Sequence, residues 1–215
     1  GSRITTHNLD YLFYQKNVDT LITIADYNTL THVRVKDSRT LVGYPLLGSL
    51  YWGELSDRRL FYIHTEHDRT TEENNSSYTF TIMSLDNLNK ETITQKYIPV
   101  EYPESLRNNE DYFSSFGSEE VGKKYRELWG NIEFYPPIFS IVSDGNYIFV
   151  YTFKENEQKQ RLVNIIDTVS KKQVGSAYFP FFMLLSNGYA YTFRKNSEGF
   201  FVIRKYRINP EVYGK

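Results

Sequence analysis

The chain has 215 residues, which is enough for one large hydrophobic core or several small ones. Its 25 basic and 26 acidic residues give a net charge of -1, so it lacks the basic surface with which nucleic-acid-binding proteins neutralise phosphates. The absence of cysteine excludes disulfides and thiolate metal sites. No stretch approaches the roughly 20 apolar residues of a transmembrane helix. The opening Gly1-Ser2 is interpreted as a cloning scar.

The composition favours strands over helices. The chain contains 19 Tyr, 15 Phe and 2 Trp, and such aromatic residues suit a pleated, half-buried surface. Four aromatic-rich strands are predicted in chain order: Tyr11–Gln15, Leu60–His64, Tyr147–Phe153 and Tyr189–Phe193.

Each aromatic strand is the second strand of a predicted four-stranded antiparallel unit. It is preceded by a short apolar run and followed by two further strands, except that the last unit lacks its outermost strand. The first strands are predicted at Ile4–Thr6, Ser49–Trp52, Ile138–Val142 and Phe181–Leu185. Two of the intervals between aromatic strands are near the ~40–45 residues of a propeller blade, and the middle one is about twice as long. A β-sandwich and a closed barrel are the competing folds, but neither repeats such a unit.

The sequence therefore predicts an all-β chain with about four β-propeller blades and one short helical insertion. The predicted boundaries are about 3–42 for blade 1, 46–98 for blade 2, 99–131 for the insertion, 135–179 for blade 3 and 180–210 for blade 4.

The insertion carries the signature of one helix. Ser118 can cap its N-terminus and Gly130 follows its C-terminus. Val121, Tyr125 and Leu128 fall at i, i+4 and i+7, which gives the helix one apolar face.

The last two units resemble a family of bacterial six-bladed β-propellers of the NHL-like and TolB-like kind. The resemblance depends on Tyr135–Ile138, Ser143–Val150, Val163–Asp167, Asn187–Tyr191 and Gly199–Tyr206. It implies a six-bladed ring and a periplasmic or envelope location. Six blades need roughly 250 residues or more, so the four predicted blades indicate the final portion of a longer ring; a four-bladed ring closed by an N-terminal strand is the alternative. Open blade edges predict self-association.

One cluster contains residue types that bind metals. His64, His67 and Asp68 lie within five consecutive residues, but His64 and His67 would point to opposite faces of a strand. A polar hairpin end is the competing interpretation, and it is the favoured one. No phosphate loop and no nucleophile elbow is present, so the sequence predicts no cofactor and no catalytic residue.

Five residues at strand ends or in connections are candidates for ligand binding. Aromatic rings there can stack on a sugar or a peptide, although packing between blades is the favoured explanation for each of them. Glu54 is a carboxylate that follows the predicted inner strand Ser49–Trp52. The candidates are Trp52, Glu54, Trp129, Tyr135 and Phe179.

These features predict a non-catalytic binding or scaffolding module. Its ligand would be a protein, a peptide or a glycan at one face of the propeller. The alternative is an enzyme domain, a glycosidase or a lyase, whose catalytic residues lie partly in other blades. A propeller glycosidase needs two or three carboxylates on inner strands, and the predicted inner strands carry none.

Overall fold

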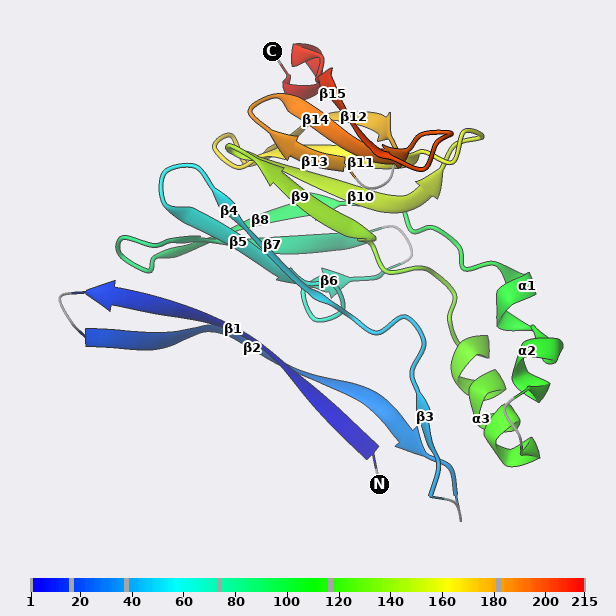
Figure 1. Cartoon of the computed structure of the whole chain (residues 1–215). Coiled ribbons are helices and arrows are strands. Elements are labelled where there is room, and N and C mark those ends of the chain that lie inside the picture. Colours follow the sequence, from blue (N-terminus) through cyan, green and yellow to red (C-terminus); the bar gives the residue numbers. More distant parts are fainter. Residues whose placement is uncertain are drawn as a thin grey trace. The chain divides into compact units, whose positions relative to one another are not determined.

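The computed structural model describes the chain as two compact units. Unit 1 comprises residues 1–49 and 101–135, and unit 2 comprises residues 50–100 and 136–215. The prediction of an all-β chain is confirmed, because the described strands form four antiparallel sheets of three to five strands (Figure 1). The described residues are 2–15, 18–36, 39–72, 75–115, 118–180 and 183–214.

Unit 1 contains a long β-hairpin. Strand β1 (Ser2–Gln15) pairs with β2 (Val18–Arg34), and the short β3 (Leu41–Gly43) adds to β2. The prediction of four short strands here is wrong, since Ile4–Thr6 and Tyr11–Gln15 belong to one continuous strand. Two register shifts in the β1–β2 ladder, after Arg3 and after Leu9, let the hairpin continue through its polar positions.

Among its described residues, unit 1 also contains three helices where one was predicted. These are α1 (Glu104–Arg107), α2 (Glu110–Ser114) and α3 (Glu119–Gly130). The cap predicted for the last helix is confirmed, because the Ser118 side chain accepts a hydrogen bond from the Val121 amide. Val121 and Leu128 are buried together with Val35 and Val42 of the same unit.

Unit 2 begins with the largest sheet. Its strands are β4 (Leu50–Leu55), β5 (Arg59–His64), β6 (Arg69–Thr70), β7 (Ser77–Ser84) and β8 (Lys90–Lys96). The predicted four-strand order β4-β5-β7-β8 is present, and β6 is a short addition beside β7.

Two further sheets complete unit 2. The first consists of β9 (Ser140–Asp144), β10 (Tyr147–Glu155), β11 (Arg161–Asp167) and β12 (Lys172–Phe179) in consecutive antiparallel order. The second consists of β13 (Met183–Ser186), β14 (Tyr189–Lys195) and β15 (Phe201–Arg207), and the 3₁₀ helix η1 (Pro210–Tyr213) follows it. Of the predicted strand Phe181–Leu185, residues 181 and 182 lie outside the described residues.

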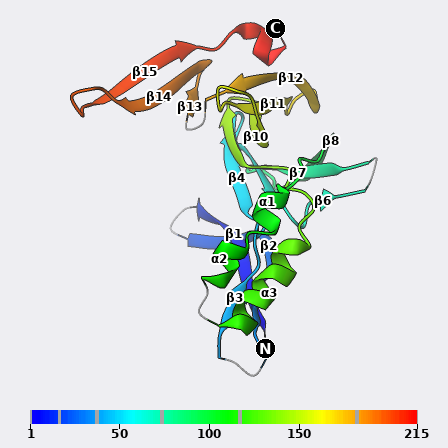
Figure 2. The same ribbon diagram turned by 90° about the vertical axis from the view of Figure 1, so that its right-hand side faces the viewer.

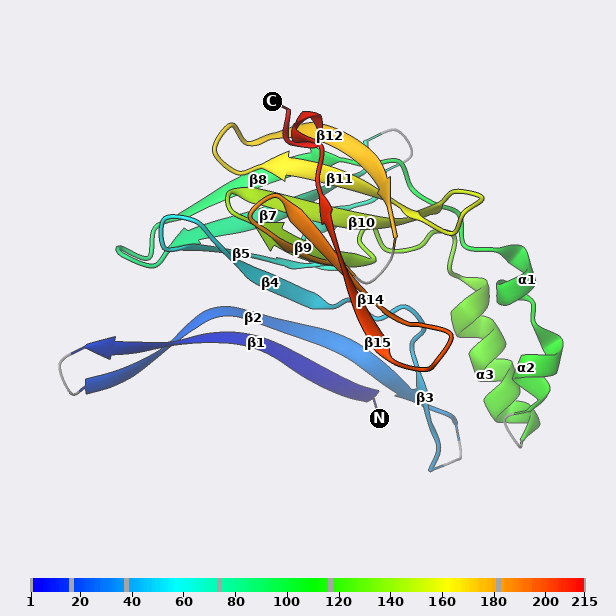
Figure 3. The same cartoon turned by 45° about the horizontal axis from the view of Figure 1, so that its top comes forward.

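The three sheets of unit 2 stack through two apolar cores (Figures 1 and 3). Alternate residues of β5, β7 and β8 pack against Ile148, Val150 and Ile166 of the middle sheet. The opposite face of the middle sheet, with Phe149 and Val163, packs against β13 and β14. The first strand of the middle sheet, β9, lies against the first strands of both neighbours, β4 and β13.

Hydrogen bonds also join the turns that follow these first strands. The Ser56 amide donates to the Gly145 carbonyl at 3.0 Å. The Asp144 carboxylate, which is buried, accepts from the amides of Asn187 and Gly188 at 2.6 and 2.8 Å. Unit 2 is thus a series of sheets that repeat one packing relation from each to the next.

Candidate functional site

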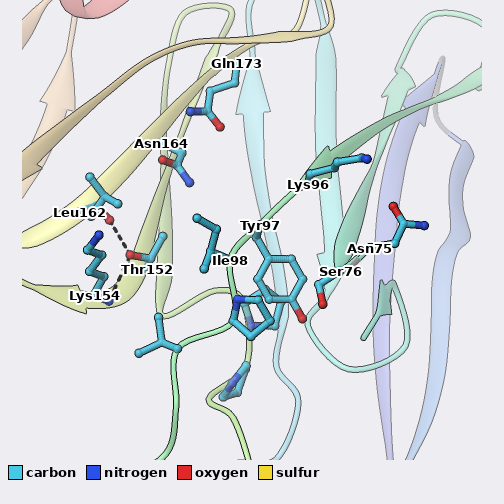
Figure 4. A pocket seen from close by; sticks show the side chains of 14 residues that line it. Asn75, Ser76, Lys96, Tyr97, Ile98, Thr152, Lys154, Leu162, Asn164 and Gln173 are labelled. Carbon is cyan, nitrogen blue, oxygen red and sulfur yellow. Dashed lines mark hydrogen bonds between the residues drawn. The ribbon is translucent and has the colours of Figure 1, made fainter. Parts of the chain in front are cut away.

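A cavity of about 800 Å³ lies within unit 2, between the outer strands of its first two sheets (Figure 4). This volume is in the range of ligand pockets in proteins. Its lining combines apolar side chains, carboxamides and two lysines: Asn75, Ser76, Lys96, Tyr97, Ile98, Pro99, Val100, Pro136, Pro137, Thr152, Lys154, Leu162, Asn164 and Gln173.

A β-bulge shapes one wall of the cavity. Along the β10–β11 ladder, the four steps from Tyr151 to Glu155 lie opposite only two steps on β11. The Thr152 hydroxyl stabilises this bulge, because it donates to the Leu162 carbonyl at 3.0 Å and accepts from the Lys154 amide at 3.2 Å (Figure 4). Bulges commonly redirect side chains beside functional sites, and this one places Thr152 and Lys154 at the cavity.

The apolar wall comes from two proline-containing segments, residues 97–100 and 136–137. Tyr97 is held in place, since its amide donates to the Ser76 carbonyl at 3.1 Å and its ring lies 5.8 Å from the ring of the buried Tyr78. Ile98, by contrast, is 89% exposed at the cavity. An exposed apolar side chain beside a cavity is a surface that a ligand can cover.

The polar end of the cavity is a hydrogen-bonded network on β11 and β12. The Gln173 side-chain Nε2 donates to the Ser176 hydroxyl, and this hydroxyl donates to the Asn164 side-chain Oδ1, both at 2.9 Å. Behind this network, burial raises the pKa of the Tyr78 phenol well above its usual value, and the nearby Asn164 side chain lowers it in part. The Tyr78 phenol is therefore neutral. The network itself presents the uncharged side-chain carboxamides of Asn164 and Gln173 to the cavity.

The charge at the cavity is positive. Lys96 and Lys154 line it, and neither forms an ion pair with a carboxylate of the described residues. The lining contains no Asp, Glu or His among the described residues. The cavity can thus hold an apolar group, donate hydrogen bonds and attract an anion.

The candidates chosen from sequence lie outside this cavity. Trp52 and Glu54 are exposed neighbours on one face of β4, and the Trp52 side chain is 58% exposed. Phe179 is buried in the core between the second and third sheets of unit 2, 6.2 Å from the Phe149 ring, so a ligand cannot stack on it.

The other two candidates belong to an aromatic cluster in unit 1. Trp129 of α3 lies 6.1 Å from the Tyr102 ring, and Tyr135 lies 4.9 Å from the same ring. Both are half-buried. This geometry fits the packing interpretation of these rings.

The histidine cluster forms a hairpin end. His64 is fully buried, and its Nδ1 accepts from the amides of Glu66 and His67 at 3.3 Å. The Asp68 carboxylate accepts from the His64 amide at 2.7 Å. No group of three or more metal-ligating side chains is found in the part of the chain that the structure describes. His64 and Asp68 thus already have partners within the turn.

Comparison with protein-family models, curated proteins and solved structures finds no match to this chain. Over the described residues, no helix combines the length and apolar character needed to cross a membrane.

Proposed function

We propose that the chain is a non-catalytic binding module built from β-propeller blades of the NHL-like and TolB-like kind. The stacking in unit 2 supports the propeller, because adjacent first strands and face-to-face antiparallel sheets are the relation between neighbouring blades. In this proposal the sheets that begin with β4, β9 and β13 are successive blades.

The observation that carries the binding function is the lining of the cavity. Its apolar wall, its carboxamides and its two lysines suit a ligand with an apolar body and an anionic group, which is a common combination in peptides, protein loops and acidic glycans. A glycosidase requires a pair of carboxylates. Since no carboxylate lines the cavity among the described residues, binding is favoured over the glycosidase or lyase alternative.

The test is a binding screen with a matched pair of variants. The protein is applied to peptide and glycan arrays, and the dissociation constant of each retained ligand is measured in solution. Tyr97→Ala removes the aromatic wall of the cavity, whereas Trp52→Ala removes an exposed aromatic ring elsewhere in unit 2.

We expect Tyr97→Ala to weaken binding about tenfold or more, as truncation of a buried aromatic contact does, while Trp52→Ala leaves the affinity within about twofold. The melting temperature of each variant reports whether the fold is retained. If the affinity depends on Trp52 rather than on Tyr97, the ligand binds at β4 and not in the cavity. Turnover of a retained glycan by the wild-type protein would replace the proposal with the enzyme alternative.

A further inference from the structure

Strand β15 exposes every one of its side chains. All seven residues of Phe201–Arg207 are exposed, among them Phe201 at 75% and Ile203 at 62%. Neighbouring large apolar residues on β13 and β14 are exposed as well, Leu184 at 59% and Phe193 at 49%. A contiguous exposed patch of this kind marks an interaction surface in a folded protein.

The backbone of β15 is open on one side. β15 is the terminal strand of the order β13-β14-β15, so no described strand pairs with its other edge (Figure 2). The Asn196 amide donates to the Phe200 carbonyl and the Ile208 amide donates to the Gly188 carbonyl, so even-numbered residues form the ladder with β14. Because hydrogen-bonded positions alternate in an antiparallel pair, the amides and carbonyls of Ile203 and Lys205 face outward.

The β14–β15 hairpin is strongly basic. Between residues 194 and 207 the one carboxylate is Glu198, and the cations are Arg194, Lys195, Arg204, Lys205 and Arg207. Some of these cations lie over aromatic rings, with the Lys205 ammonium 3.8 Å from the centre of the Tyr189 ring. The open edge therefore combines apolar, aromatic and positively charged side chains.

This charge argues against a second copy of the same strand. Two β15 strands paired antiparallel would bring Arg204, Lys205 and Arg207 of both copies into adjacent strands with no carboxylate between them. In the register centred on Arg204, two arginines would lie directly opposite each other, which destabilises a sheet. On one face of β15, acidic side chains of an added strand would oppose Arg204. On the other face, where Lys205 and Arg207 lie beside Phe201 and Ile203, apolar side chains of the added strand would cover the two apolar residues.

We propose that β15 is a docking edge for an extended acidic segment of a partner protein, which adds as a further antiparallel strand. Main-chain hydrogen bonds to the outward amides and carbonyls supply affinity, and the cationic and apolar side chains supply selectivity. This surface is separate from the cavity, because none of the cavity residues lies on β13, β14 or β15.

The test uses a fluorescent peptide of about ten residues that alternates Glu with Val, which suits the length of an ordinary strand. Its control peptide alternates Lys with Val. Fluorescence anisotropy measures binding to the intact protein, and hydrogen exchange measures protection of the Ile203 and Lys205 amides. We expect the acidic peptide to bind, to protect these two amides and to bind more weakly at high salt.

The decisive variant is Ile203→Pro. Proline removes an outward amide without removing a hydrogen bond to β14, and edge strands tolerate it at such positions. Ile203→Ala is the matched control, since it shortens the side chain and keeps the amide. We expect the proline variant to bind about tenfold more weakly than the alanine variant, with Tyr97→Ala unchanged from the wild type, so this proposal and the cavity proposal can fail separately.

Three outcomes would overturn the proposal. Equal binding of both peptides would show that charge does not select the strand. An Ile203→Pro affinity equal to that of Ile203→Ala would show that the peptide does not pair with the backbone of β15. If light scattering shows that the wild-type protein is a dimer and that the Ile203→Pro variant is a monomer, the edge pairs with a second copy of the chain instead.

Discussion

The Asp144 carboxylate offers the sharpest test of how the second and third sheets of unit 2 are joined. Asp144 is 9% exposed. It accepts from the amides of Asn187 and Gly188 at 2.6 and 2.8 Å and from the Tyr213 hydroxyl at 2.8 Å. The Asp144→Ala variant would leave all three of these donors without their acceptor.

The expected loss is large for a single substitution. A hydrogen bond to a charged group contributes about 1.5–3 kcal/mol, and bonds that share one acceptor are not additive. We therefore expect the free energy of unfolding to fall by about 3 kcal/mol. Asp167→Ala is the control, because Asp167 also ends a strand of the middle sheet but accepts one bond, from the Val169 amide at 2.9 Å; its loss should be about 1 kcal/mol.

Urea unfolding followed by circular dichroism measures both losses. Hydrogen exchange adds a local readout, since the amides of Asn187 and Gly188 should exchange faster in Asp144→Ala. A double-mutant cycle with Tyr213→Phe isolates the phenol bond, with an expected coupling of about 1 kcal/mol. If Asp144→Ala costs no more than Asp167→Ala, the turn-to-turn bonds do not stabilise the sheet contact and the reasoning is refuted.

Two further predictions concern the middle sheet of unit 2. A Cβ at Gly175 would lie 2.9 Å from the Val212 carbonyl oxygen, so Gly175→Ala should lower the free energy of unfolding by about 1–2 kcal/mol in urea, whereas Gly130→Ala, which meets open space, should be neutral. Burial raises the pKa of Tyr151 from 10 to about 12, so the folded state favours the neutral phenol. The contribution of this preference to the free energy of unfolding is fully present below pH 10 and is lost as the pH rises through 12. Tyr151→Phe should therefore flatten the alkaline fall of the melting temperature; an unchanged pH profile would contradict this.

The sequence predicted the aromatic-rich strands of unit 2 closely because aromatic residues suit a pleated, half-buried surface. Predicted Leu60–His64 differs by one residue from β5, and predicted Tyr189–Phe193 begins at the same residue as β14. Gly145, Asn187 and Gly188 lie in turns of this unit and have positive φ angles. Glycine and asparagine adopt this left-handed backbone conformation more readily than other residues. In this unit the strand and turn propensities of the sequence agree with the tertiary packing.

Unit 1 was predicted less well because its turn residues do not form turns. Asp10 and Asn28 favour turns on their own, but here Thr23 donates to the Asp10 carboxylate and Thr6 donates to the Asn28 side chain across the hairpin. These cross-strand hydrogen bonds hold polar residues on the exposed face of long strands. A pattern of local propensity cannot reveal such partners, which lie more than ten residues away.

The cavity could not be predicted from the sequence because none of its residues carries a recognisable motif. Its lining comes from six separated parts of the chain, and it depends on the β10 bulge, which leaves no signature in the sequence. Trp52 was a candidate because it is an aromatic residue at a strand end, and Glu54 because it is a carboxylate beside a predicted inner strand. The segment Tyr135–Ile138 indicated only a family resemblance, although its proline pair at 136–137 forms part of the apolar wall.

The last sheet of unit 2 shows why β15 differs from every other strand. The apolar face of the middle sheet is covered by β13, β14 and η1, with Val212 and Tyr213 packed against its core, and η1 lies against both β11 and β12. Because η1 takes this place, β15 does not cover the middle sheet, and all seven of its residues are exposed.

The cations of β15 could serve only to prevent aggregation, since lysines on an edge strand discourage pairing with other copies. That role alone would not require large apolar side chains at the positions whose amides face outward. Phe201 and Ile203 occupy two of these positions and are among the most exposed apolar residues of the chain. A strand that repels its own copies and still presents apolar side chains is suited to a different partner, and an acidic strand satisfies both features.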